Sequence, residues 1–261
     1  MGSDDSGSWL YRYPPLLGGT LVKRYKRFFA DIELDSGEIV TAHCPNTGPM
    51  TGICLPGNRV MLSQSDNPNR KLAYTWEMIE LTQPELMSRE ISSDRSVWVG
   101  VNTGLPNKVA GLLLQQKVIP ALSHYQQIRA EVPYGQEKSR IDFLLDPGLD
   151  SVAIPDPRPI YVEVKNTTWT SGSLALFPDT VTTRGQKHLR ELMSLMPTAR
   201  AVMLYFINRG DCDRFSPGDE KDPTYGKLLR QAIDRGLEVY PCRFQVSPAG
   251  LQYLGLASLE I

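Results

Sequence analysis

Apolar and polar positions alternate in short runs along the first third of the chain, and turn residues separate the runs. Residues 35–37 (Asp-Ser-Gly) form a hairpin turn between two runs, and residues 56–58 (Pro-Gly-Asn) introduce another. No helical period interrupts this part of the chain. The pattern predicts a small barrel whose strands lie at residues 19–22, 28–34, 38–43, 59–64 and 72–81.

The period changes in the rest of the chain. Val109, Leu112 and Leu113 recur at helical spacing, and residues 201–207 form the continuous apolar run of a buried parallel strand. Thr183 and Gln186 have the spacing of a capping box. The pattern predicts a helix at 106–118, strands at 128–134, 140–145 and 160–165, a helix at 183–195, a strand at 201–207, a helix opened by Asp222 and Pro223 and ended by Gly236, and a strand at 237–242. This order describes a mixed sheet flanked by helices.

These patterns predict an α+β chain with two domains. Residues 1–14 are interpreted as a polar tail, 15–82 as an OB-like barrel that binds nucleic acid, 83–97 as a linker and 98–261 as an α/β domain with a mixed central sheet. An OB-like barrel is expected because it closes its sheet with about five strands and presents one face to oligonucleotides. Pro84 and nearby serines mark the linker.

Composition limits the classes of function. The 261 residues carry a net charge of −1, which excludes a uniformly basic coat for nucleic acid but leaves room for a local basic strip. The four cysteines, at positions 44, 54, 212 and 242, lack the spacing of a zinc site, so reduced thiols are expected. No apolar stretch approaches the ~20 residues of a membrane span. We expect a cytoplasmic protein without a membrane partner; the sequence does not indicate its oligomeric state.

Three residues in two predicted strands carry the clearest chemistry. Glu163 and Lys165 are two positions apart and therefore share a strand face, and Asp142 lies on the preceding strand. Two carboxylates can hold a divalent cation, and an amine beside them can assist a water molecule that attacks a phosphodiester. The alternative is an exposed face with a surface ion pair. The apolar flanks favour a buried site, where a charge is paired or functional.

That strand and helix order, with its carboxylates and lysine, resembles the PD-(D/E)XK nuclease superfamily over residues 98–210. The leading Pro-Asp is absent, because Arg140 and Ile141 precede Asp142. The resemblance implies that Asp142 and Glu163 bind Mg²⁺ or Mn²⁺ and that Lys165 orients or deprotonates the attacking water. Glu131, on the preceding strand, is not expected to be a further ligand.

Other polar residues lie close to this motif in the sequence. Arg184 and Gln186 occupy the start of the helix after the third strand, where a helix N-terminus attracts phosphate, and Arg140 adjoins the motif. We predict that these three contact nucleic acid. For Lys187, on the same helix with His188, a solvated face is the favoured interpretation. Asp179 is expected either to orient Arg184 or to begin a turn.

Basic and aromatic residues also gather in the predicted barrel. The run Lys23, Arg24, Tyr25, Lys26, Arg27 is followed by Phe28. Cations follow a phosphate backbone and aromatic rings stack on bases, so we predict a nucleic-acid surface here. The alternative is a basic edge strand protected against aggregation.

Several loops, taken together with the motif, resemble the sugar fermentation stimulation protein family from about residue 16 to the end. The matching segments are residues 43–50, 67–71, 102–107, 139–143, 162–166 and 177–185. The resemblance implies an OB-like domain followed by a nuclease-like domain, DNA binding and, in enteric bacteria, a part in regulating sugar metabolism.

The leading hypothesis is therefore a largely non-specific DNA-binding protein with a metal-dependent phosphodiesterase site. The alternative is a non-catalytic DNA-binding regulator of sugar metabolism that retains a relic nuclease fold. The sequence leaves open whether cleavage occurs, and whether the partner is DNA or RNA, single-stranded or duplex.

Overall fold

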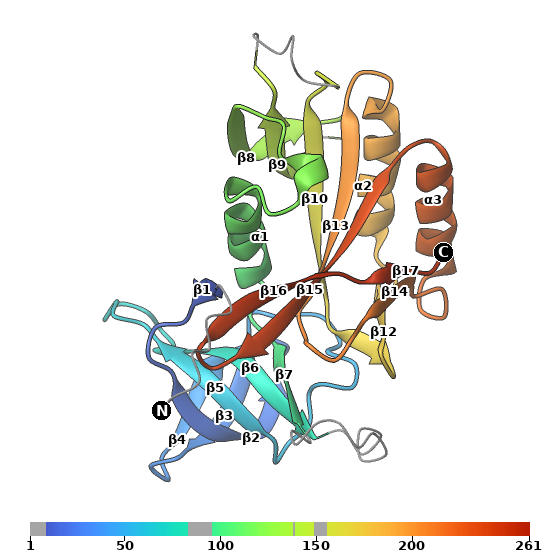
Figure 1. Ribbon diagram of the computed structural model, residues 1–261. Coiled ribbons are helices and arrows are strands. Elements are labelled where there is room, and N and C mark those ends of the chain that lie inside the picture. The colour runs from blue at the N-terminus through green and yellow to red at the C-terminus, as the bar shows by residue number, and fades with distance from the viewer. Residues whose placement is uncertain (1–8, 83–95, 138, 149–155) are drawn as a thin grey trace, which may run out of the picture.

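A computed structural model of the chain describes residues 9–82, 96–137, 139–148 and 156–261 (Figure 1). These residues form a β-barrel and a larger mixed sheet with helices on both faces. Residues 1–8 of the expected tail and 83–95 of the expected linker lie outside the described residues. No helix in the described ranges is long and apolar enough to cross a membrane.

The barrel has the strands that the alternating pattern predicts. The strand β3 (Phe29–Leu34) illustrates the alternation, since Ala30, Ile32 and Leu34 point into the core while the residues between them stay more accessible. The sheet closes through a parallel pairing of β4 with β6, which gives the predicted OB barrel. Its strands, in the ring order β4-β3-β2-β5-β6, are β4 (Ile39–His43), β3 (Phe29–Leu34), β2 (Leu17–Tyr25), β5 (Arg59–Gln64) and β6 (Tyr74–Thr82).

The second domain is built on a seven-stranded sheet of order β1-β16-β15-β13-β10-β9-β8. Strands β10, β13 and β15 run parallel, and the other pairings in this sheet are antiparallel. The predicted mixed sheet is confirmed. The bounds are β8 (Gln127–Tyr134), β9 (Ser139–Asp146), β10 (Ile160–Thr167), β13 (Arg200–Ile207), β15 (Glu238–Ser247) and β16 (Gly250–Leu256).

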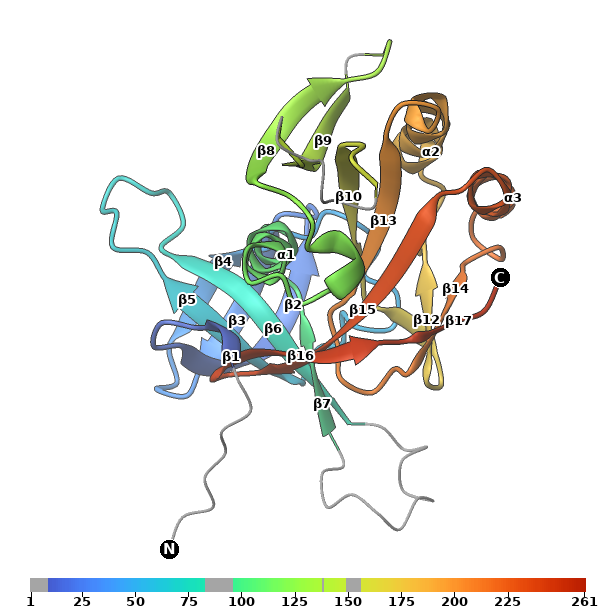
Figure 2. The ribbon, with the colours of Figure 1, turned by 45° about the horizontal axis from the view of Figure 1, so that its top comes forward.

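Helices cover both faces of this sheet (Figures 1 and 2). α1 (Leu105–Gln115) packs on one face with Phe143, Val162 and Val164, while α2 (Thr183–Leu195) and α3 (Pro223–Asp234) cover the other. A short 3₁₀ turn, η2, spans Pro120–Leu122. A small sheet that the sequence did not predict contains β11 (Trp169–Ser171), β12 (Leu174–Phe177), β14 (Arg214–Pro217) and β17 (Ser258–Leu259).

Two strands depart from the predicted division of the chain. β1 (Trp9–Arg12), placed in the polar tail by sequence, pairs with β16 at the other end of the chain and buries Leu10. β7 (Ser96–Gly100), divided by sequence between the linker and the second domain, extends the barrel sheet by pairing with β6. Both strands are short, and β1 pairs with a strand distant in sequence, so local patterns do not reveal it.

The start of α2 also differs from the expected capping box. The hydroxyl of Thr182, not Thr183, accepts the backbone N–H of Gly185 at 3.1 Å. The Gln186 amide donates to both carboxylate oxygens of Asp222 at 3.0 Å instead of reaching back to the cap. Asp222 is itself the N-cap of α3, so one buried carboxylate joins the first turns of both helices.

The barrel and the second domain are in direct contact. The backbone N–H of Gly100 donates to the carbonyl of Asn208 at 3.0 Å, and the Thr103 hydroxyl donates to the carbonyl of Pro45 at 3.0 Å. Met78 of β6 is buried in the core that α1 shares with the large sheet. A strand of the barrel therefore contributes a buried side chain to the core of the second domain.

Candidate active site

Asp142 lies where strands β9 and β10 separate. Their pairing ends at Val162 and Phe143. Beyond it, the backbone N–H of Val164 donates to Asp142 Oδ2 at 2.7 Å. Asn107 of α1 donates from Nδ2 to Asp142 Oδ1 at 2.6 Å. Each carboxylate oxygen is therefore fixed by one donor and keeps a lone pair for another partner.

Glu163 and Lys165 share a face of β10, as the sequence predicts. Lys165 Nζ lies 2.6 Å from Glu163 Oε1, and His188 Nδ1 of α2 contacts the same oxygen. The lysine amine is also 3.3 Å from His188 Nδ1. Glu163 is only 3% exposed, and its second oxygen, Oε2, has no hydrogen-bond partner in the described part of the chain.

The two carboxylates have different electrostatic surroundings. Burial raises the pKa of Asp142 to about 6, and the negative charge of Glu163 adds to this rise. Burial also pushes the pKa of Glu163 upward, but Lys165 and His188 outweigh it, so the pKa of Glu163 is lowered. Both groups are therefore anionic at neutral pH, and Asp142 is the one that gains a proton first on acidification.

A pocket of about 270 Å³ adjoins this cluster on the side of α2. Arg184 Nε lies 3.4 Å from His188 Nε2, and Arg140 Nη1 donates to the Glu131 carbonyl at 2.9 Å. The side chains of Arg140 and Arg184 remain exposed. Cations therefore border the pocket beside the two carboxylates. Its lining residues are Glu131, Ser139, Arg140, Arg184, Lys187 and His188.

Glu131 has an unusual backbone in this pocket. Its φ is 55°, in the left-handed region that non-glycine residues rarely adopt. The pairing of β8 with β9 holds at Ala130 and Val132 on either side of it, so the strand is distorted locally. No group of three or more His, Cys, Asp or Glu side chains suited to a metal ion occurs among the described residues. Glu131 thus lines the pocket but does not complete a carboxylate triad.

One predicted nucleic-acid contact, Gln186, and two neighbouring polar residues have partners within the protein. Gln186 is bound to Asp222, as described above, and therefore does not face the pocket as a free phosphate donor. Burial raises the pKa of Asp179, and the backbone of Thr51 in the barrel partly offsets this rise, so the carboxylate lies near the barrel. Lys187, expected to be solvated, donates to the carbonyl of Glu137 at 2.6 Å.

The basic run of the barrel divides into two groups. Arg24 Nη2 donates to the carbonyls of Asn46 at 2.8 Å and Gly48 at 3.0 Å, so this guanidinium holds a loop. Lys23 and the Tyr25 hydroxyl both contact Asp31.

Lys26 and Arg27 differ from those residues. They form the tip of the β2–β3 hairpin, where their φ values of 48° and 64° fit a tight hairpin turn. Both are exposed, and Phe28 beside them is 49% exposed. The hairpin tip is therefore the part of the run with cations and an aromatic ring available to a ligand.

Sequence reasoning did not assign roles to Asn107 and His188. His188 is four residues after Arg184, so the two share a helix face, which was the available signal. Asn107 stands in the turn-rich segment 102–107, and nothing local indicates that it reaches Asp142.

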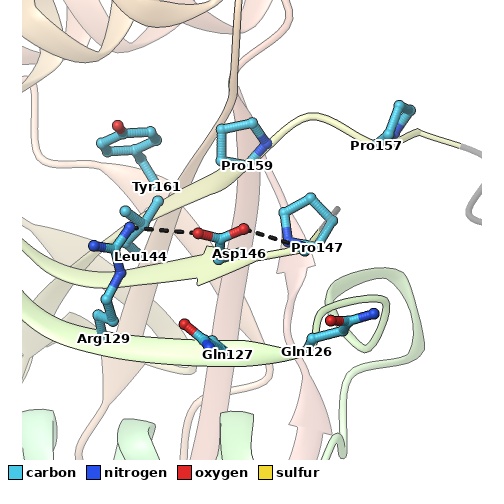
Figure 3. Close-up of a pocket in the computed structure, with 10 residues that line it drawn as sticks. Gln126, Gln127, Arg129, Leu144, Asp146, Pro147, Pro157, Pro159 and Tyr161 are labelled. Carbon is cyan, nitrogen blue, oxygen red and sulfur yellow. Dashed lines mark hydrogen bonds and ion pairs between the residues drawn. The ribbon is translucent and has the colours of Figure 1, made fainter. Parts of the chain in front are cut away.

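A larger pocket, of about 640 Å³, opens at the other end of β8 and β9 (Figure 3). Tyr161 and several prolines and glutamines line it, and Arg129 pairs with Asp146 across it at 3.4 Å. Asp146, the carboxylate of that pair, is half-exposed, and no amine or second carboxylate accompanies it among the described lining residues. The described lining therefore lacks the chemistry of the Asp142 cluster.

Comparison with known proteins identifies the family. A family model described as "Sugar fermentation stimulation protein RE domain" matches residues 104–250, and one described as "SfsA N-terminal OB domain" matches residues 22–88. The chain belongs to the sugar fermentation stimulation protein family. The resemblance to this family predicted from the loops is confirmed, while the likeness of its second domain to PD-(D/E)XK nucleases stays a prediction.

Relatives match this family member over nearly its whole length. A "Sugar fermentation stimulation protein homolog" from Cyanothece sp. is 64% identical over 253 residues, covering 97% of this chain and 99% of the relative. A homolog from Synechococcus elongatus is 64% identical over 252 residues, covering 97% and 98%. The solved structure of Pyrococcus furiosus SfsA in complex with Ca²⁺ has a TM-score of 0.81 at 23% identity, covering 97% and 99%, which shows the shared fold.

Proposed function

We propose that this protein binds nucleic acid and hydrolyses its phosphodiester bonds at Asp142, Glu163 and Lys165 with Mg²⁺ or Mn²⁺. The observation that carries the proposal is the convergence of a buried carboxylate, Glu163, and a partly buried one, Asp142, from separate strands with one lysine at the point where β9 and β10 part. Exposed arginines border the adjoining pocket, as a phosphate ligand requires.

The residues present fit a divalent cation. Glu163 Oε2 is buried without a partner in the described part of the chain, and each Asp142 oxygen keeps a lone pair. Mg²⁺ is commonly bound by one or two carboxylates, with water and substrate phosphate completing its shell. The Ca²⁺ in the Pyrococcus furiosus structure also supports a hard cation. When bound, the ion supplies positive charge at the phosphate and lowers the pKa of water.

The protein's own groups then have distinct tasks. Asn107 and the Val164 N–H hold Asp142 in position, and His188 holds Glu163. Lys165 lies at the edge of this cluster, where its amine can orient the attacking water or, in its neutral form, take up the proton of that water. Arg140 and Arg184 provide charge-assisted hydrogen bonds to the phosphate.

The barrel supplies a second contact with nucleic acid. Lys26, Arg27 and Phe28 offer two cations and an exposed ring at one hairpin tip, although the whole chain has a net charge of −1. Such contacts with phosphate carry little sequence information, so binding is largely non-specific and weakens as salt rises.

A cleavage assay tests the proposal. Wild type, Asp142→Asn, Lys165→Ala and Lys108→Ala are purified in parallel and incubated with single-stranded and duplex DNA and RNA, with Mg²⁺, Mn²⁺ or chelator. Lys108 is an exposed lysine of α1 outside the cluster and serves as the matched control. We expect metal-dependent cleavage by wild type and Lys108→Ala, and a loss of about 100-fold or more in the other two.

Two outcomes contradict the proposal. Equal cleavage by all four proteins would assign the activity to a contaminant or another site. Binding by wild type without cleavage under any metal condition would favour the alternative, a non-catalytic DNA-binding regulator.

A further inference from the structure

A small pocket lies at the junction of the barrel and the second domain. Its volume is about 120 Å³. Pockets for whole drug-sized ligands are typically about 300–1,000 Å³, so this one accommodates a single flat ring rather than a nucleotide. Its walls come from a barrel loop, the segment before α1, the end of β10, and β11 and β12. The lining residues are Asn46, Thr103, Asn166, Thr167, Thr168, Trp169, Leu176, Phe177 and Asp179.

The polar groups of this pocket are incompletely paired. Thr167 is 1% exposed, yet its hydroxyl has no hydrogen-bond partner in the described part of the chain. The side-chain oxygens of Asn46 and Asn166 accept from Gly48 N and Asn208 Nδ2. Their amide nitrogens have no partner among the described residues and can donate, while Asp179 can accept. A buried hydroxyl without a partner is costly, so a ligand that satisfies it binds favourably.

One wall of the pocket is an aromatic ring held in place. A Cβ at Gly218 would come within 2.7 Å of Cζ3 of Trp169, so the backbone packs directly on the indole. Lys221 Nζ lies 5.5 Å from the ring centroid. Phe177, also in the lining, packs against Tyr205 and Tyr225 at centroid distances of 5.6 and 5.2 Å. These rings therefore offer a preorganised surface for stacking.

The pocket is close to the candidate active site along the chain. Asn166, Thr167 and Thr168 directly follow Lys165 at the end of β10. At about 3.3 Å per strand residue, they lie within roughly 10 Å of that lysine's backbone. A nucleic acid strand whose phosphate sits at the cluster would bring a neighbouring base to this distance.

We propose that this pocket receives one unpaired base of the bound nucleic acid, stacked on Trp169 and hydrogen-bonded along its edge by Asn46, Asn166 and Asp179. A flat ring with donors and acceptors at its edge matches the aromatic wall and polar rim, and proteins read unstacked bases in this manner. The inference rests on the proposed function, because it states where the base next to the phosphate bound at that site is held.

A thermodynamic cycle tests this inference with single-stranded DNA in the absence of metal. Affinities of wild type, Trp169→Phe and Trp169→Ala are measured for an oligonucleotide and for a sugar–phosphate chain of the same length that lacks bases. We expect Trp169→Ala to weaken binding of the oligonucleotide by about 5- to 150-fold, the range for base-stacking rings, and to leave binding of the base-free chain unchanged. Trp169→Phe is expected to retain most of the affinity.

A second variant avoids reliance on the packed indole. Thr103 lines the pocket from an exposed position, so Thr103→Met narrows the pocket and leaves the core intact, while it removes the exposed hydrogen bond from this hydroxyl to the Pro45 carbonyl. It is expected to weaken only the base-containing ligand, whereas Thr224→Met, an exposed threonine on α3 outside the pocket, is expected to weaken neither. If the variants of Trp169 and Thr103 weaken both ligands equally, or neither, the inference is overturned while the proposed function stands. If wild type binds neither ligand, both are overturned.

Discussion

The backbone N–H of Val164 donates to Asp142 Oδ2 at 2.7 Å, in the gap that opens where β9 and β10 stop pairing. The Asp142 carboxylate thus accepts a backbone N–H that a carbonyl of the neighbouring strand would accept if the pairing continued. The bond satisfies a backbone donor and places a partly buried anion next to Glu163. Two neighbouring anions lower the stability of the metal-free protein, and this loss of stability can be measured.

Replacing Asp142 is expected to stabilise the metal-free protein at neutral pH. Burial raises the pKa of this group from 3.8 to about 6, so the folded protein binds its proton more tightly than the unfolded chain does. The free energy of unfolding therefore falls as pH rises between those values. In chelator at pH 8, Asp142→Asn should be more stable than wild type by about 1–3 kcal/mol. Thermal melts at pH 4 and pH 8 measure the difference, which should vanish at pH 4.

Asp146→Asn is the matched control, because it removes a half-exposed carboxylate from the same strand. It should change stability little at either pH, since surface pairs contribute about 0–1 kcal/mol. An Asp142→Asn protein that is less stable than wild type at pH 8 would contradict this account of the buried charge.

Removing His188 is expected to slow cleavage without weakening substrate binding. The imidazole contacts Glu163 Oε1 and lies 3.3 Å from Lys165 Nζ, so it positions both groups. His188→Ala should lower kcat by about 10- to 100-fold, the usual effect of losing such a supporting residue, with KM little changed. Arg184→Ala should instead raise KM, because Arg184 faces the pocket. Steady-state kinetics separate the two effects, and a rise in KM alone for His188→Ala would argue against its role.

The hairpin tip of the barrel is expected to govern affinity. Changing Lys26 and Arg27 together to Ala should weaken DNA binding and reduce the slope of log affinity against log salt by about 1.4–1.8, if each makes one phosphate contact. The melting temperature should not change, because both side chains are exposed. Fluorescence anisotropy over a salt series measures the slope.

Arg24→Ala should behave in the opposite way. Its guanidinium donates to the carbonyls of Asn46 and Gly48, so its loss is expected to cost about 1–3 kcal/mol of stability. An unchanged melting temperature together with a reduced salt slope would contradict this role and would support the prediction from the sequence that Arg24 belongs to the binding surface.

Asp222 is expected to be important for stability although it is remote from the chemistry. It caps α3 through Tyr225 N and accepts from Thr182 N and Gln186. Asp222→Ala leaves these donors without a partner and should cost about 2–3 kcal/mol, as measured by denaturant unfolding. Thr183→Ala should cost little stability, because Thr182 is the cap. A large loss of stability in Thr183→Ala would instead support the capping box predicted from the sequence.

The sequence predicted those parts of the site that depend on local periodicity. The two-residue spacing of Glu163 and Lys165 placed both on one strand face, and the burial of Val162 and Val164, which alternate with them, agrees with the predicted strand. The barrel strands followed from the same alternation. These features depend on neighbours along the chain, so their patterns are visible without the fold.

Features that depend on distant segments were not predictable in this way. The end of the β9–β10 pairing, which positions Asp142, is set by how two strands diverge in space. Gln186 had the residue type and position of a phosphate contact, but Asp222, far along the chain, binds it. The pairing of β1 with β16 joins the two ends of the chain and leaves no local signal.

The central claim is that Asp142 and Glu163 together hold a divalent cation. Crystals of wild type and Glu163→Gln soaked in Mn²⁺ test it most directly, through the anomalous signal of the metal. The account predicts one peak in wild type that contacts carboxylate oxygens of both residues, and its loss in Glu163→Gln. A wild-type map without a peak at this cluster, or a peak that persists unchanged in the variant, would contradict it.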